Sequence, residues 1–198
     1  TPDKAVVFTN RYGQPQEAVL NGSANLQGTK TLSGRDWTDS DRFTFILEPG
    51  DEITREAISK NMIVMPGETE ITLNGNYADQ EQVPFAFGDI TFKAEGTYTF
   101  KMTEKKPEEG QEISGITYST NQRVVTVTVT DNKRGQLEAA VTEASGDTNF
   151  TNVYDTESVT LPGQENLMVK KMISGRDWKD GDSFTFTLAG GDEATLGD

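Results

Sequence analysis

The most constraining feature of this chain is that it repeats itself, and the repeat is long. The segment Ser33-Gly34-Arg35-Asp36-Trp37 recurs as Ser174-Gly175-Arg176-Asp177-Trp178, an offset of 141 residues, and the match continues through Leu47 and Leu188. A second pair lies upstream of each copy, where residues 8–12 recur as residues 150–154 at an offset of 142. A period of this length exceeds that of a solenoid unit and indicates domains that fold independently, one after another along the chain.

The order of the matching segments predicts how the chain divides. Residues 1–15 are expected to be the C-terminal end of a preceding repeat, residues 16–157 one complete repeat, and residues 158–198 the N-terminal part of the next. The two links, 13–16 and 160–164, are rich in glycine, proline and glutamine, a composition typical of turns.

Short runs of β-branched and aromatic residues fill the complete repeat, with turn-forming residues between them. This pattern predicts an all-β fold, an Ig-like β-sandwich with one complete domain between two partial neighbours. Residues 54–62 are expected to form a short helix with Ile58 and Met62 facing inward. The expected strands are 26–33, 42–48, 69–74, 83–93, 96–105, 122–131, 136–144 and 149–154.

Composition excludes several classes of function. The chain has no cysteine and no histidine, so disulfides, thiolate metal sites and catalytic triads that contain histidine are all ruled out. The formal net charge of −14 disfavours binding to nucleic acid and to anionic membranes. No apolar run is long enough to span a bilayer and no signal peptide is apparent. We therefore expect an excised fragment that needs no cofactor and makes no membrane contact.

Alternation along the expected strand 96–105 places one acidic residue on an apolar face. Side chains two residues apart share a face of a strand. Tyr98, Phe100 and Met102 therefore share a face with Glu104, while the threonines and Lys101 point the other way. Glu104 is predicted to end an inward-facing row.

The same test brings a lysine and an asparagine inward. Asn152 lies between two aromatic residues on one face of 150–154, and Lys30 shares its face with Leu26 and Leu32. Each complete repeat is thus expected to direct one lysine, one glutamate and one asparagine into its core.

Equivalent residues stand in the two partial repeats. Asn10 corresponds to Asn152, and Lys171 corresponds to Lys30 and shares its face with Leu167, Val169 and Ile173. The partner lysine of Asn10 would lie upstream and the partner asparagine of Lys171 downstream, so both are expected to be unpaired here.

Buried polar residues of these types allow two interpretations. The first is a buried Lys–Glu ion pair with a hydrogen-bonded asparagine, or side chains that reach solvent from strand ends. The second is chemical: an apolar setting lowers the pKa of lysine and raises that of glutamate, which leaves a neutral amine beside an amide carbon. In this interpretation Glu104 is the acid that polarises the Asn152 carbonyl and relays a proton to departing ammonia. The product is a Lys30–Asn152 isopeptide bond.

An ordered set of short motifs resembles the streptococcal-type pilin isopeptide-linkage repeat of Gram-positive surface proteins. The resemblance covers residues 24–156 and implies the same roles: Lys30 and Asn152 as the cross-linked pair and Glu104 as the acid. In chain order the motifs are Lys30-x-x-x-Gly34, Phe43-Thr44-Phe45, Ile90-Thr91-Phe92, Gly96-x-Tyr98, Thr103-Glu104, Gly115-Ile116-Thr117-Tyr118, the valine-rich strand 124–129 and Phe150-Thr151-Asn152.

Two further features could in principle bind ligands. Asp36, Asp39 and Asp41 could supply oxygen ligands to Ca²⁺, although a solvated acidic loop is the preferred interpretation and we predict no metal. Trp37 and Trp178 could stack on sugars, but packing over a sheet edge is preferred.

The sequence therefore favours a structural role: a stalk or shaft repeat of a pilin or adhesin that cross-links itself once and is not an enzyme. Its expected partners are neighbouring repeats of the same polypeptide, with host surface or matrix as further candidates. Its expected location is extracellular and cell-wall anchored, with the anchor signal outside this sequence. The alternatives are an adhesive module that binds host glycan or protein through its loops, and a hydrolase with paired carboxylates, for which Glu104 lacks a second inward acid.

Overall fold

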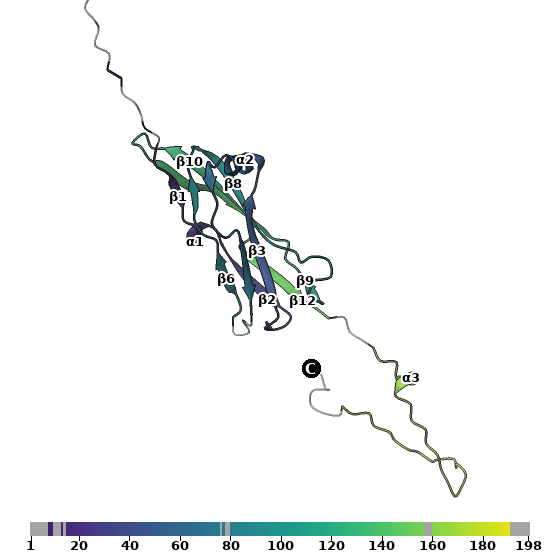
Figure 1. The fold of residues 1–198 in the computed structure, drawn as a ribbon. Helices are drawn as coiled ribbons and strands as arrows, with labels where there is room; N and C mark the ends of the chain where they lie inside the picture. Colours follow the sequence, from purple (N-terminus) through teal and green to yellow (C-terminus); the bar gives the residue numbers. More distant parts are fainter. Residues whose placement is uncertain are drawn as a thin grey trace, which may run out of the picture. The chain divides into compact units, whose positions relative to one another are not determined.

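The computed structural model describes residues 8–9, 13, 15–75, 77, 80–156 and 160–190. The chain forms two units, Thr1–Thr156 and Glu157–Asp198, each taken by itself below. The first unit is an all-β sandwich with two short helices among its described residues, and its ribbon is drawn in Figure 1.

Three sheets build the first unit. The five-stranded sheet has the order β11 (Leu137–Ser145), β10 (Gln122–Asp131), β8 (Gly96–Glu104), β3 (Arg42–Pro49), β5 (Glu70–Asn74). The four-stranded sheet has the order β6 (Val83–Ala86), β2 (Gln27–Ser33), β12 (Asn149–Tyr154), β9 (Ile116–Thr117). The three-stranded sheet has the order β1 (Ala18–Leu20), β7 (Ile90–Phe92), β4 (Ile63–Val64).

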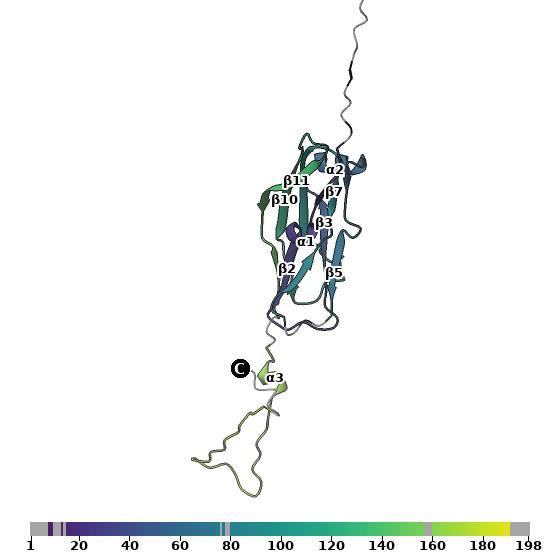
Figure 2. The ribbon, with the colours of Figure 1, turned by 90° about the vertical axis from the view of Figure 1, so that its left-hand side faces the viewer.

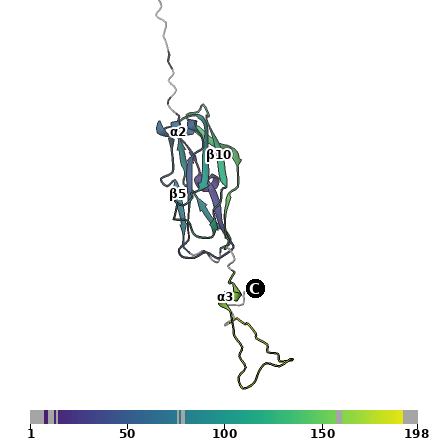
Figure 3. The same ribbon diagram turned by 90° about the vertical axis from the view of Figure 1, so that its right-hand side faces the viewer.

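In the five-stranded sheet every neighbouring pair is antiparallel. In Figure 3, β5 and β10 lie on opposite sides of the body, in keeping with that strand order. The four-stranded sheet differs because β12 pairs with β2 in parallel, Phe150 opposite Lys30 and Asn152 opposite Leu32. The first and last long strands of the domain therefore lie side by side (Figure 1).

Strict alternation produces the core between the sheets. In β10 the residues Val125, Val127 and Val129 are buried, and the threonines between them are partly exposed. Aromatic rings fill the centre: the Phe45 and Phe85 rings stack with centroids 3.9 Å apart, and Phe150 meets Phe45 edge-on at 5.3 Å. Burying such rings is the main favourable term in folding a sandwich of this size.

Two helices in the first unit begin at side-chain caps. Helix α1 (Gly22–Asn25) starts after Asn21, and helix α2 (Glu52–Ser59) starts after Asp51, whose side chain accepts a hydrogen bond from the Thr54 N–H. Helix α2 lies at the same end of the sandwich as the upper part of β10 and β11 (Figure 2). The sequence predicted a helix here, but the boundaries 54–62 and the inward Met62 were wrong. Met62 follows the helix and is exposed.

The predicted strands agree with those of the structure in seven of the eight ranges to within one residue at each end, and the eighth divides. The expected strand 83–93 forms β6 and β7, which belong to different sheets and are separated by Phe87-Gly88-Asp89, residues that lie outside both strands. Glycine is required nearby for packing: a Cβ on Gly22 would lie 2.0 Å from the Gly88 carbonyl oxygen. The short strands β1, β4 and β9 carry too few residues to show a pattern, and the sequence did not predict them.

The second unit contains one short helix, α3 (Gly163–Asn166), and no strand among residues 160–190. Its local structure nevertheless repeats that of the first unit. Helix α3 corresponds to α1 at the offset of 141 residues, and in each the following leucine donates its N–H to the first helical carbonyl, Leu26 to Gly22 and Leu167 to Gly163.

Candidate functional site

Lys30, Glu104 and Asn152 meet in the interior of the first unit. They come from β2, β8 and β12, and so from both large sheets. Lys30 and Asn152 are fully buried and Glu104 is 6% exposed. The alternation of each strand is the cause, since all three residues stand on the same face as the buried apolar residues beside them.

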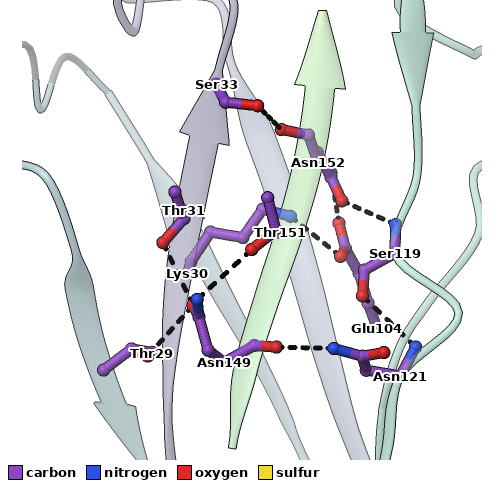
Figure 4. A network of polar contacts seen from close by, with 10 residues as sticks. All are labelled: Thr29, Lys30, Thr31, Ser33, Glu104, Ser119, Asn121, Asn149, Thr151 and Asn152. Atoms are coloured by element: carbon purple, nitrogen blue, oxygen red, sulfur yellow. Dashed lines mark hydrogen bonds and ion pairs between the residues drawn. The ribbon is translucent and has the colours of Figure 1, made fainter. Parts of the chain in front are cut away.

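Glu104 joins the other two side chains. Its Oε2 accepts a hydrogen bond from Lys30 Nζ at 2.9 Å, and its Oε1 accepts one from Asn152 Nδ2 at 2.7 Å. Figure 4 shows the three side chains converging, with the lysine reaching across from β2 towards Glu104 and Asn152. The Glu104 carboxylate thus hydrogen-bonds the Lys30 amine and the Asn152 amide at the same time.

The apolar surroundings shift both pKa values towards the neutral forms. Burial lowers the pKa of Lys30 to about 8, although the carboxylate of Glu104 acts in the opposite direction. Burial likewise raises the pKa of Glu104, against the effect of the lysine charge and of the hydrogen bonds from Lys30 and Asn152. The Lys30 ammonium also lies 4.6 Å from the centroid of the Phe43 ring, which contributes the site's one aromatic contact to the amine.

The orientation of the Asn152 amide differs from the sequence-based expectation. Glu104 was expected to hydrogen-bond the amide carbonyl, whereas Asn152 Oδ1 accepts the backbone N–H of Ser119 at 2.7 Å. A backbone N–H can only donate, so the amide oxygen must face Ser119 and the amide nitrogen faces Glu104. Sequence reasoning missed Ser119 because a backbone donor leaves no signature in residue identity.

A second asparagine fixes β12 against β2 on the opposite face. Asn149 Oδ1 accepts hydrogen bonds from Thr29 at 3.2 Å and from Thr31 at 3.0 Å, both on β2. A slip of one residue would turn Asn152 to the other face of the sheet, so these contacts help to hold the register that brings Asn152 to Lys30.

Comparison with known proteins identifies the fold family. The profile of the Spy0128-like isopeptide containing domain matches residues 26–155. The chain belongs to this family. Its members are structural pilin domains of the bacterial surface rather than enzymes. The family range encloses β2, β8 and β12, and so all three residues of the buried cluster.

Pilins of Streptococcus pyogenes are among the similar proteins. The chain is 27% identical over 185 residues to a protein named "Pilin" from Streptococcus pyogenes serotype M1, and the match covers 87% of this chain and 51% of the relative. The crystal structure of the major pilin from Streptococcus pyogenes matches at 23% identity with a TM-score of 0.46, over 69% of this chain and 52% of that one. The major pilin of a further serotype matches at 19% identity with a TM-score of 0.43, over 70% and 54%. The chain therefore spans about half the length of the curated relative it matches.

Of the two equivalents in the partial repeats, only Lys171 falls within the described residues, and it is not part of the cluster. Asn10 lies outside the described residues. Lys171 is exposed and lies 4.6 Å from the centroid of the Phe184 ring, the same distance as between Lys30 and Phe43. The inward face expected for Lys171 is absent from the described part of the second unit, where Leu167 and Val169 are exposed as well. No described strand packs against it there.

The candidate Ca²⁺ ligands are engaged otherwise or exposed. Both carboxylate oxygens of Asp41 accept hydrogen bonds from Arg35, at 2.7 and 2.8 Å, which holds the pKa of Asp41 below its usual value despite burial. Asp36 and Asp39 are exposed, and no metal-binding group of acidic residues occurs within the described ranges. Arg176 and Asp182 form the same ion pair in the second unit.

Trp37 packs into the hydrophobic core, so its ring is not free to stack on a sugar. It is buried and meets Phe43 and Tyr77 edge-on, with ring centroids 5.1 Å away in both cases. Its counterpart Trp178 is 55% exposed but keeps the edge contact with Phe184. The repeated aromatic pair is therefore a local packing motif in both units.

Proposed function

We propose that this chain is a stalk or shaft segment of a Gram-positive pilin or adhesin whose complete repeat cross-links itself through a Lys30–Asn152 isopeptide bond. The observation that carries the proposal is the buried cluster, in which Glu104 hydrogen-bonds both the amine and the amide nitrogen. Both side chains are wholly withdrawn from water. A buried ion pair alone stabilises a fold little, so the arrangement is better explained by a reaction than by the ion pair itself.

The reaction exchanges one amide nitrogen for another. Glu104 takes a proton from Lys30, whose neutral Nζ attacks Cγ of Asn152. Glu104 then gives a proton to Nδ2 and takes one from the new Nζ–Cγ linkage, the Cγ–Nδ2 bond breaks, and ammonia leaves. Atoms and charge balance: an amine and a primary amide become a secondary amide and one ammonia, and the proton first held by Lys30 remains on Glu104. A hollow of about 240 Å³ lined by Glu104 and Ser119 gives the ammonia a way out.

The cross-link would close a loop of nearly the whole domain. On the chain-entropy model used for disulfides, a loop of this length raises the free energy of unfolding by about 4–5 kcal/mol. The chain has no cysteine, so the cross-link would supply the stabilisation that disulfides supply in many extracellular proteins.

The proposed setting is the cell surface, with neighbouring repeats and other pilin subunits as partners and the cell wall as anchor. The only described helices are short, and none is both long and apolar enough to cross a membrane. Among the described residues of 15–156, the large apolar side chains that are exposed include no aromatic ring, so they lend no support to the adhesive alternative; they are Val19, Ile53, Met62, Val64 and Val153.

An intact mass is the direct test. The folded chain is expected to weigh one ammonia less than its sequence, and a peptide digest is expected to join the peptides of Lys30 and Asn152. A single loss is expected because Asn10 and Lys171 belong to incomplete repeats. A mass equal to that of the sequence would disprove the bond, and a second loss or a peptide joining Asn10 to Lys171 would show that the partial repeats react with each other.

The rate of bond formation is expected to fall above about pH 8. The reaction begins with one proton shared by Lys30 and Glu104, because Glu104 takes it from Lys30 and then gives it to Nδ2 of Asn152. Burial lowers the pKa of Lys30 to about 8, so above that pH the pair loses this proton before the attack. The rate should be level just below pH 8 and decrease by up to about tenfold per pH unit above it. The measurement is the mass of chains recovered unfolded from inclusion bodies and sampled during refolding. A rate that rises through pH 8 would show instead that Lys30 must lose its proton to solvent before the attack.

A further inference from the structure

We infer that the backbone N–H of Ser119 is a catalytic group of the cross-linking reaction, a one-donor oxyanion hole for the Asn152 carbonyl. The inference rests on the proposed function and adds a residue to its chemistry. When Lys30 Nζ attacks Cγ, the negative charge that develops appears on Oδ1, and that atom already accepts the Ser119 N–H at 2.7 Å. Donors at this distance from a developing oxyanion stabilise the transition state most.

The donor is held in place from both sides. Before Ser119, β9 pairs with β12 through Thr117 opposite Val153, so the chain runs alongside the strand that carries Asn152. After it, Asn121 donates its Nδ2 to the Asn149 carbonyl on β12, and its own N–H to Ser119 Oγ. Figure 4 shows Ser119 and Asn121 facing β12 on the side opposite Lys30. A donor fixed before the reaction does not have to reorganise during it.

Glu104 and the backbone N–H of Ser119 contact different atoms of the reacting amide. Glu104 touches both nitrogens and can carry protons from the amine to the leaving amide nitrogen, but it makes no hydrogen bond to the carbonyl oxygen. Ser119 touches only the oxygen. The amide nitrogen and the amide oxygen of Asn152 therefore have separate hydrogen-bond partners. The nucleophile, Lys30 Nζ, is held by Glu104, which also binds the amide nitrogen.

A one-atom change in the backbone tests the inference. Incorporating lactic acid at position 119 replaces the N–H by an ester oxygen, and Ser119→Ala is its amide twin, which keeps the N–H. The rate of ammonia loss after a translation pulse is expected to be roughly 100-fold lower in the ester than in Ser119→Ala. An ester at Thr120 is the positional control and should react as the original chain does.

The outcomes separate the two proposals. If the original chain loses no ammonia, the proposed cross-link fails and this inference with it. If the original chain and the folded ester form the bond equally fast, the cross-link stands and the role of Ser119 is disproved.

A second measurement applies even where the ester does not fold. The Lys30→Met variant lacks the nucleophile and keeps the amide intact, so a scalar coupling across the hydrogen bond between Ser119 N and Asn152 Cγ should be detectable by NMR. Detection supports the proposed donor, and absence of the coupling in the folded variant overturns it.

Discussion

Replacing Glu104 by glutamine is expected to give a chain that folds into the same sandwich but keeps the full mass of its sequence. Glutamine has nearly the same shape but cannot take a proton from Lys30 or give one to Nδ2 of Asn152, so the cross-link should not form. Burial lowers the pKa of Lys30 to about 8, and in this variant the pKa should fall further because the carboxylate that opposes the shift is gone. Intact mass and circular dichroism measure the two results, and the free energy of unfolding should fall by about 4–5 kcal/mol with the bond.

Glu70→Gln is the matched control. Glu70 is an exposed carboxylate that pairs with Lys105 at 3.1 Å on the outside of the sandwich, and its neutralisation should leave the ammonia loss intact. Cross-linked Glu104→Gln would contradict the role of Glu104. Other carboxylates from the same part of the sequence are committed elsewhere, since Asp89 accepts the Gly22 N–H and Glu95 accepts the Asp131 N–H.

Strand alternation is the reason why the sequence predicted so much of this fold. In β8 it places Tyr98, Phe100, Met102 and Glu104 on one face, and the structure buries all four. A period of two residues survives in any strand long enough to show it, because one face packs against the core and the other does not. Strands of two or three residues, such as β4 and β9, show no such period and were missed.

The parts that the sequence could not predict depend on tertiary contacts. Residues 83–93 contain the turn-forming pair Gly88-Asp89, and the chain leaves one sheet at Phe87 and joins another at Ile90. Met62 follows helical spacing from Ile58, but helix α2 ends at Ser59 before reaching it. The second error comes from a local pattern that the packing of the domain overrides, whereas the first had a local signal in Gly88-Asp89 that the strand prediction did not use.

The candidate site likewise has features that the sequence could predict and one that depends on tertiary contacts. Lys30, Glu104 and Asn152 carry side chains whose type is conspicuous on an apolar face, so the sequence could propose them before any geometry was known. The direction of the Asn152 amide could not be proposed, because it is set by the Ser119 N–H, which every residue except proline would offer. The chemistry assigned to Glu104 therefore shifted from the carbonyl oxygen to the two nitrogens.

Mechanical loading is expected to separate the cross-linked chain from its uncross-linked form more clearly than any equilibrium measurement. If the proposed bond is present, tension that enters the domain at β1 reaches Lys30 on β2, crosses the bond to Asn152 on the neighbouring strand β12, and leaves through Tyr154. Residues 31–151 then lie outside the loaded path and cannot be extended without breaking a covalent bond. In Asn152→Ala, which lacks the electrophile, these residues should unravel and add roughly 400 Å of chain, at about 3.4 Å per residue.

Single-molecule force spectroscopy on the full chain measures this difference, with Asn132→Ala as control because Asn132 lies in the turn between β10 and β11, away from the buried cluster. The original chain and Asn132→Ala should show no unfolding step of that length at forces that unfold Asn152→Ala. A step of roughly 400 Å in the original chain would mean that Lys30 and Asn152 are not joined. If the original chain, Asn132→Ala and Asn152→Ala all lack this step, the parallel β2–β12 pairing resists the load by its hydrogen bonds alone. The isopeptide bond is then not what protects the domain.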